Sequence, residues 1–258
     1  MTTPVRTDLD AYRVAIAELP LRAAASRDTG GAVVALSGDG EWWGQAADAI
    51  ARGAAAVVVA HPAAAPASEI DALASRADGV PIVLDRPLLR TDVAASVTAT
   101  LPALHAPAVL AIECHAPDGA LPPALRDAIG WARILGRAPL TCRTAESWSG
   151  RSLALLETAG HEPVSIIAAT QPGAPPLGRL RITALAETLV EIDDDADLSV
   201  TMTDAAGRRT WAPRFEGPER LALRRAIEAA DARRRTPDLG DLRHDAAVAA
   251  LVATASRS

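Results

Sequence analysis

The alternation of short β-branched runs with alanine-rich segments constrains the fold of this chain more than any other feature. Residues 32–37 (AVVALS) and 55–60 (AAVVVA) are such runs, and residues 42–52 between them have the length and composition of a helix. A second helix is predicted over 67–77 and a further strand over 80–84. Continuous apolar strands joined by helices are typical of a parallel sheet that is covered on both faces.

The second half of the chain has a different periodicity. Apolar and polar residues alternate over 180–184 and again over 198–203, which predicts strands with one buried and one wet face. The stretch Asp204–Gly207 follows the second of these runs and is predicted to be a hairpin turn. Strands are also expected over 108–114 and 139–145, and helices over 121–135, 218–234 and 241–255.

These patterns predict an α/β protein with two domains. Residues 1–105 are expected to form a Rossmann-like parallel sheet with helices. Residues 106–258 are expected to form an α+β domain built on an open, mostly antiparallel sheet.

Composition excludes several classes of function. The net charge of -6 and the pI near 5.4 argue against a nucleic-acid surface, which needs a concentrated basic face. No segment has the length and low charge of a membrane span, and no secretory signal is expected at the N-terminus. The two cysteines, Cys114 and Cys142, have neither a zinc spacing nor a disulfide framework, so we expect reduced thiols, no metal and a cytoplasmic protein.

The chain contains no lysine, because all 26 residues in the Lys+Arg count are arginine. Asparagine is also absent and alanine is abundant, so a coding bias toward GC-rich codons is the simplest explanation. The chemical consequence does not depend on the cause. No Schiff base, lysine general acid or phosphate-loop lysine can form, because arginine stays protonated near neutral pH.

The order of elements and two stretches of sequence resemble the Gfo/Idh/MocA family of NAD(P)-dependent oxidoreductases. The first stretch, GAAAVVVAHPAAAPASEIDALASRADGVPIVLDRPLLRTD (53–92), is similar to the family's two strands that end in Thr-Pro-Asn and Glu-Lys-Pro loops. The second, from Gly217 to Ser256, is similar to the family's last two helices. The resemblance implies NAD or NADP as the cofactor and a sugar, inositol or related polyol as the substrate.

The same resemblance implies which residues would line the cofactor site. His61 and Pro62 stand at the family's Thr-Pro-Asn loop, and Asp85, Arg86 and Pro87 stand at its Glu-Lys-Pro loop. Arg86 therefore replaces the catalytic lysine, and it keeps the charge while losing acid-base competence. Two interpretations remain: an ion pair or cap at the end of the strand, or a ligand contact without catalysis.

A second departure concerns the histidine that the family carries on a helix of its C-terminal domain. The corresponding stretch is LRDAIGWARILGRAP (125–139), which contains no histidine. One register places Arg126 at the histidine position and another places Trp131 there. Asp127 is interpreted as an exposed helix aspartate or as a remnant of the family's Asp-His pair.

A third departure concerns the glycine-rich loop that lets backbone amides approach a pyrophosphate. Residues 12–17 are predicted to be the first strand, and no glycine follows them before Gly30. The later cluster Gly38-Asp39-Gly40-Glu41-Trp42-Trp43-Gly44 has one residue too many, two acids and two bulky tryptophans. Asp39 is either an ordinary turn residue or, in the family register, the acid that binds the adenine ribose.

Three functional hypotheses follow. The first is a non-catalytic subunit or ligand-binding homologue that keeps the fold, since the lysine, the histidine and the glycine loop are all missing. The second is an NAD(P)-dependent oxidoreductase with a rearranged cofactor loop and Arg86 as an anion-binding residue. The third is a scaffolding role, in which the open C-terminal sheet packs against a second copy or an active homologue.

Overall fold

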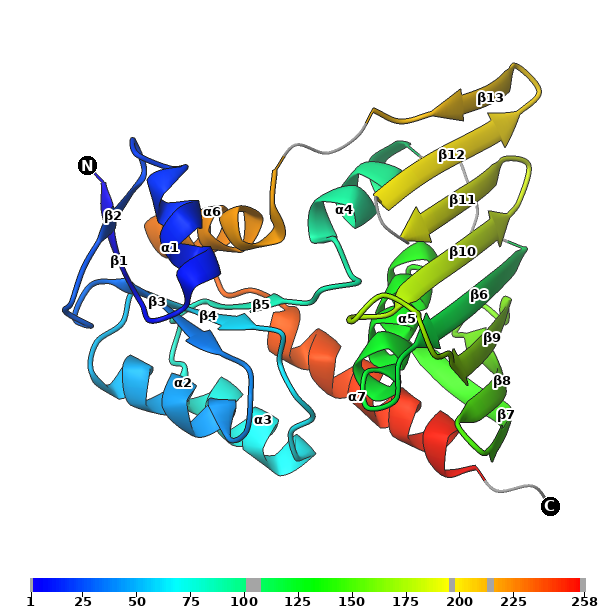
Figure 1. Cartoon of the computed structure of the whole chain (residues 1–258), viewed down its shortest axis with the longest axis horizontal. Coiled ribbons are helices and arrows are strands. Elements are labelled where there is room, and N and C mark those ends of the chain that lie inside the picture. Colours follow the sequence, from blue (N-terminus) through cyan, green and yellow to red (C-terminus); the bar gives the residue numbers. More distant parts are fainter. Residues whose placement is uncertain (1, 101–107, 195–197, 213–215, 256–258) are drawn as a thin grey trace. The chain divides into compact units, whose positions relative to one another are not determined.

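In the computed structural model, the described residues are 2–100, 108–194, 198–212 and 216–255. The chain divides into two compact units, Met1–Pro87 with Phe215–Arg243, and Leu88–Arg214 with His244–Ser258 (Figure 1). The domain boundary predicted at 105–106 lies outside the described residues. The division falls at Pro87 instead, and residues 215–243, which were predicted for the second domain, belong to the first unit.

The first unit is built on a five-stranded parallel sheet with the order β2-β1-β3-β4-β5. Its strands are β1 (Thr3–Thr7), β2 (Ala23–Ala25), β3 (Val33–Ser37), β4 (Ala56–Ala60) and β5 (Ile82–Asp85). The chain runs from β1 outward to β2, then crosses back over β1 to β3 and continues in the other direction. The sheet is thus doubly wound, with its topological switch point between β1 and β3. The Rossmann-like parallel sheet predicted from the sequence is confirmed.

Helices cover both faces of this sheet. They are α1 (Asp10–Ala17), α2 (Trp42–Ala51), α3 (Ala67–Arg76) and α6 (Pro218–Asp231). Alternate residues of each strand point to opposite faces, so α1 and α6 pack on one set, which includes Val33 and Val58. Helices α2 and α3 pack on the other set, which includes Val34 and Val57.

One prediction for the first unit was wrong. Residues 12–17 were predicted to be the first strand, but they form helix α1. Tyr12, Ala15 and Ile16 are buried, and their spacing of three and four residues is that of one helical face. The first strand is β1, which lies nearer the N-terminus and was not predicted.

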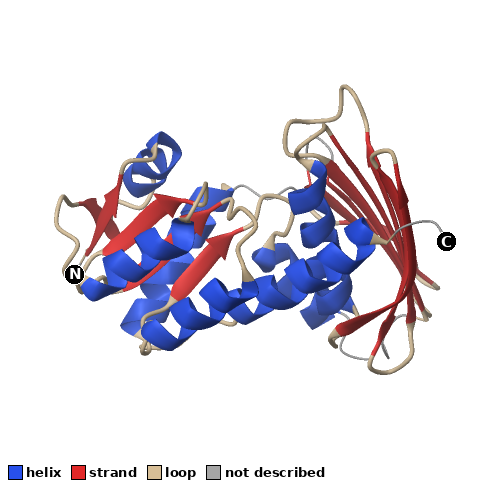
Figure 2. Ribbon diagram, turned by 90° about the horizontal axis from the view of Figure 1, so that it is seen from below, coloured by secondary structure: helices blue, strands red, loops and turns tan. Residues whose placement is uncertain are grey.

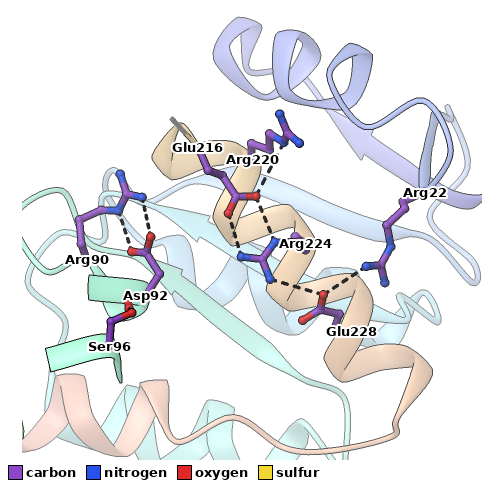
Figure 3. A network of polar contacts seen from close by, with 8 residues as sticks. All are labelled: Arg22, Arg90, Asp92, Ser96, Glu216, Arg220, Arg224 and Glu228. Atoms are coloured by element: carbon purple, nitrogen blue, oxygen red, sulfur yellow. Dashed lines mark hydrogen bonds and ion pairs between the residues drawn. The ribbon is translucent and has the colours of Figure 1, made fainter. Parts of the chain in front are cut away.

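Arginine and glutamate side chains form a network along α6 that reaches Arg22, before β2, through Glu228 (Figure 3). Arg224 bridges Glu216 at 2.8 Å and Glu228 at 3.5 Å, and Glu228 also pairs with Arg22, which precedes β2, at 3.2 Å. These side chains are partly exposed, so each pair contributes little alone. The network helps to hold a helix from far along the sequence in the N-terminal unit.

The second unit is built on an eight-stranded sheet with the order β13-β12-β11-β10-β6-β9-β8-β7. Among the described strands of this sheet, only β6 and β9 are parallel neighbours, so the expected open, mostly antiparallel sheet is confirmed. Its strands are β6 (Val109–Ala116), β7 (Leu140–Trp148), β8 (Arg151–Thr158), β9 (Pro163–Thr170), β10 (Arg179–Leu185), β11 (Leu189–Asp194), β12 (Leu198–Asp204) and β13 (Gly207–Thr210). Asp204 pairs with Gly207 at the predicted hairpin.

The described helices of the second unit cover one face of this sheet and leave the other bare, as Figure 2 shows. They are α4 (Thr91–Thr100), α5 (Leu121–Leu135) and the part of α7 (Asp238–Thr254) that follows Arg243. The covered face is apolar and includes Leu110, Ile112 and Ile166. No helix among the described residues has the length and hydropathy needed to cross a membrane.

Candidate functional site

The carboxyl ends of parallel strands are where doubly wound sheets bind ligands. Strands β3, β4 and β5 end at this edge of the first unit, and their ends are joined by main-chain hydrogen bonds. The amide of Gly38 donates to the carbonyl of Ala60 at 2.6 Å, and the amide of His61 donates to the carbonyl of Asp85 at 2.9 Å. The structure therefore brings all six predicted site residues to one edge: Asp39, His61, Pro62, Asp85, Arg86 and Pro87.

Gly38 is required at this edge for packing. A Cβ atom built at Gly38 would lie 2.5 Å from the carbonyl oxygen of Ala60 and 2.5 Å from the Cα of Pro62. The carbonyl of Gly38 also accepts a 2.8 Å hydrogen bond from the amide of Ala63. The backbone of this glycine is therefore held against the turn that follows β4, so its lack of a side chain serves the protein's own packing.

The segment between Gly38 and helix α2 is occupied by a tryptophan and by acids. Trp42 is fully buried at the first position of α2, and its indole N–H donates to the carbonyl of Ala63 at 3.2 Å. Asp39 is exposed and accepts a 2.7 Å hydrogen bond from the hydroxyl of Ser37. Glu41 occupies the N-cap of α2. The side chains of this segment thus form their hydrogen bonds with neighbouring turn residues of the protein.

Asp85, the last residue of β5, interacts with helix α1. Its carboxylate accepts a 2.7 Å hydrogen bond from the hydroxyl of Tyr12, and both side chains are buried. Burial and then the negative charge of Asp85 raise the pKa of Tyr12 above its ordinary value. Tyr12 thus remains a hydrogen-bond donor at neutral pH, and this oxygen of Asp85 is occupied by the protein itself.

Arg86 stands where the resembled family has its lysine. Its side chain is only 6% exposed, so it is buried in the folded chain. A buried guanidinium keeps its proton, so Arg86 can hold a charge or a hydrogen bond but cannot act as a general acid. His61, at the end of β4, is exposed with a φ of 50° and lies in the turn, whereas Pro62 is buried.

Helix α5 of the second unit carries the residues at the predicted histidine position, and they have a structural role. The carboxylate of Asp127 accepts a 3.2 Å hydrogen bond from the amide of Leu88, and the indole of Trp131 donates to the carbonyl of Leu88 at 2.7 Å. Asp127 is 1% exposed and lies 3.5 Å from the guanidinium of Arg126. The interpretation of Asp127 as an exposed helix aspartate was wrong.

Cys114 and His244 are held in structural environments. Burial and then the charge of Asp127 raise the pKa of Cys114 to about 12, so its thiol is unreactive at neutral pH. The histidine ring of His244 accepts a hydrogen bond from the amide of Leu140 at 3.1 Å. Within the part of the chain that the structure describes, no group of three histidine, cysteine or acidic residues could hold a metal ion.

A nicotinamide dinucleotide does not fit the residues at this edge. Its pyrophosphate needs open backbone amides at a helix N-terminus. Helix α1 has Asp10 in its first turn, and Asp8 precedes it. Helix α2 follows Glu41 and starts with the buried Trp42. Carboxylates at both positions repel phosphate, and Gly38 is already packed against the neighbouring turn.

Comparison with solved structures finds dehydrogenases and a ketoreductase whose fold matches the whole chain. UDP-N-acetylglucosamine 3-dehydrogenase GnnA from Acidithiobacillus ferrooxidans matches with a TM-score of 0.76 and 14% identity, over 99% of this chain and 97% of that chain. KijD10, a 3-ketoreductase from Actinomadura kijaniata solved in complex with NADP, matches with a TM-score of 0.70 and 12% identity, over 100% and 98%. A dehydrogenase from Chromobacterium violaceum matches with a TM-score of 0.68 and 13% identity, over 97% and 86%.

No protein-family model matches the sequence, and no curated protein matches it. The structural likeness, at these low identities, shows a shared fold. It supports the resemblance to Gfo/Idh/MocA oxidoreductases at the level of architecture. The activity of this chain has to be argued from the residues of its site, because one fold can host many functions.

Proposed function

We propose that this protein keeps the two-part architecture of NAD(P)-dependent sugar oxidoreductases but acts as a non-catalytic subunit or ligand-binding homologue. The observation that carries the proposal is the packing of Gly38 against Ala60 and Pro62, with Trp42 buried at the start of the following helix. The loop after β3 is therefore packed against the turn after β4. The absence of a lysine and of a histidine on α5 removes the acid-base groups that the resemblance implies.

The alternative is an NAD(P)-dependent oxidoreductase that acts on a sugar, inositol or related polyol. The likeness to GnnA and to KijD10, which was solved with NADP, favours it. It requires a cofactor to bind beside Asp10 and Glu41 and a proton donor other than lysine. The acidic helix starts weigh against the first requirement, and the buried state of Arg86 and Tyr12 weighs against the second.

A nucleotide titration separates the two functions. NADH and NADPH are titrated into the full chain, and binding is followed by nucleotide fluorescence, with KijD10 as the positive control. We expect no saturable signal up to about 1 mM, a concentration at which only binding weaker than about -4 kcal/mol escapes detection. Saturation at micromolar concentration contradicts the proposal. An Arg86→Ala variant then tests whether the Asp-Arg-Pro loop lines the site.

The bare face of the second sheet supports the subunit role. Leu153 of β8 and Ile167 of β9 are directly paired across the strands, and they are 46% and 49% exposed. Leu155 is exposed on the same face. Farther across the sheet, Arg181 of β10 is paired in register with Glu113 of β6 and with Asp193 of β11. A face with apolar residues and both signs of charge can pair with its own copy around a two-fold axis.

Light scattering tests this self-association. We expect a dimer for the native chain and a monomer for the Leu153→Glu/Ile167→Glu variant, because two buried carboxylates oppose an apolar contact. Leu251→Glu, at an exposed position of α7, is the control and should leave the mass unchanged. A monomeric native chain contradicts the second-copy interface and leaves an active homologue as the partner to test.

A further inference from the structure

The first sheet has a stretch of one face that none of the described helices covers. Only residues 26–32 connect β2 to β3, which is too short for the helix that crosses over a doubly wound sheet. The apolar cluster under α2 and α3 takes its strand residues from β3, β4 and β5, and β1 contributes none of its buried members. On this face β1 presents Pro4, which is exposed, and Arg6, which is half-buried.

A hollow of about 260 Å³ lies along this uncovered face. The carboxyl half of β1, the strand β3 and one side of helix α2 form its walls. It therefore starts at the switch point between β1 and β3 and extends along the face of the sheet to Arg52, the C-cap residue of α2. None of the six residues that the sequence predicted for a cofactor site lines it.

The charges of this hollow are those of an anion site. Arg6 and Arg52 both line it, and the guanidinium of Arg6 is held by a hydrogen bond to the hydroxyl of Thr29, which is itself buried. Among the residues that the structure describes, neither guanidinium forms an ion pair. The one acid in the lining, Asp8, has a side chain that is 97% exposed to solvent and lies 4.0 Å from Arg13, so its charge is screened at the rim of the hollow. Arg6 and Arg52 are therefore two cationic side chains in one hollow, and neither is neutralised by a carboxylate.

The remaining lining suits the rest of a small organic molecule. The amide of Gln45 offers further hydrogen bonds, and Val34 and Leu36 form an apolar wall, while the hydroxyl of Ser37 is already bonded to Asp39. A site with a few polar groups on an apolar surface fixes the orientation of a small ligand. Arg6 and Arg52 supply planar donors that match the oxygens of a phosphate or a carboxylate.

We propose that the hollow between β1, β3 and α2 binds a small organic anion, a phosphate ester or a carboxylate, through Arg6 and Arg52. This inference goes beyond the proposed function and does not depend on it, because it uses a different part of the sheet. A chain that binds dinucleotide at its carboxyl edge could still bind an anion here.

Calorimetry with simple probes tests the site. Glycerol 3-phosphate and succinate are titrated separately into the full chain in a low-salt buffer without phosphate, and we expect one of them to saturate below about 10 mM. Tighter binding of glycerol 3-phosphate identifies phosphate esters as the class, and tighter binding of succinate identifies carboxylates. Absence of saturation by both probes overturns the proposal.

Variants locate the binding. Arg6→Gln and Arg52→Gln should each weaken the probe by roughly tenfold to a hundredfold, the effect of losing one charge-assisted contact. Gln45→Glu should weaken binding of the probe by charge repulsion. Arg52 and Gln45 are both exposed, so the Arg52→Gln and Gln45→Glu variants should fold. Arg76→Gln, an exposed change on α3, is the control. Equal affinity in native chain, Arg52→Gln and Gln45→Glu variants overturns the site even if Arg6→Gln fails to fold.

Discussion

The phenol of Tyr12 donates a hydrogen bond of 2.7 Å to the carboxylate of Asp85, which joins helix α1 to the end of strand β5. Asp85 is one of the residues that the resemblance placed beside a cofactor. Its engagement by a buried tyrosine means that one carboxylate oxygen at this edge of the sheet is held by the protein itself. This bond and the contacts around it can be tested by substitution and by pH.

Replacing Tyr12 by phenylalanine should destabilise the protein. The ring remains and only the hydroxyl is lost, so the expected cost is that of one buried hydrogen bond to a carboxylate, about 1.5–3 kcal/mol in the free energy of unfolding. Urea unfolding of Tyr12→Phe measures it. Val14→Ala, at an exposed position of the same helix, should change the value by less than about 0.5 kcal/mol. Equal stability of Tyr12→Phe and the native chain would show that the bond is unimportant.

Alkaline pH should unfold the protein because two buried groups resist ionisation. The pKa values of Tyr12 and Cys114 are raised in the folded state, that of Cys114 to about 12. Stability is therefore fully present below the pKa values of the unfolded chain, about 8.5 for cysteine and 10 for tyrosine, and is lost as pH rises above them. Tyr12 is the only tyrosine, so its ultraviolet absorbance reports the ionisation directly. Its ionisation should coincide with unfolding, and a reversible titration near pH 10 in folded protein contradicts the buried bond.

Alanine substitutions at Gly38, before α2, and at Gly44, within α2, should change the free energy of unfolding in opposite directions. Gly38→Ala places a Cβ 2.5 Å from backbone atoms and should lower the free energy of unfolding by roughly 1–3 kcal/mol. Gly44 lies within α2, and a Cβ at this position would meet nothing within 4 Å, so Gly44→Ala should raise the free energy of unfolding by about 0.5–1 kcal/mol through helix propensity. Thermal unfolding of both variants measures the pair. A neutral Gly38→Ala would mean that this loop can move away from Pro62 and is free for another use.

The contributions of Asp127 and Trp131 to stability should be coupled, because both side chains bind the backbone of Leu88. Asp127→Ala removes a buried carboxylate that pairs with Arg126 and accepts a hydrogen bond from the amide of Leu88, and it should cost about 3–5 kcal/mol. Trp131→Phe leaves the carbonyl of Leu88 without its donor and should cost at least about 1–3 kcal/mol. A double-mutant cycle in urea should give a coupling of about 0.5–3 kcal/mol. Additive costs would contradict the shared role, and Asp118→Ala, an exposed change, is the control.

Much of the fold could be predicted because the strands and helices carry their own periodicity. The runs over 32–37 and 55–60 are β3 and β4, and the helix predicted over 121–135 is α5 with those bounds. Helix α1 was missed because it is short and its apolar residues can be read as a strand. Strand β1 was missed because Thr3–Thr7 has a single buried residue, Val5.

For the site, the sequence could predict only which residues lie at the ends of the strands. Parallel strands bring Asp39, His61 and Asp85 to one edge whatever their side chains do. The partners of these residues come from distant parts of the chain, and nothing in the sequence pairs Tyr12 with Asp85. The burial of Asp127 also depends on Leu88, which lies 39 residues away. The hollow beside β1 follows from the short link between β2 and β3, which is visible only once the strands are placed.

Calorimetric titration of NADPH into the native chain, with NADH in parallel, tests the central claim most directly. The claim is that Gly38, Trp42 and the acids around them have closed the edge where a dinucleotide would bind. The predicted result is the heat of dilution alone. Saturable heat with micromolar affinity, suppressed by competition with the other dinucleotide, would contradict the claim and favour an active oxidoreductase.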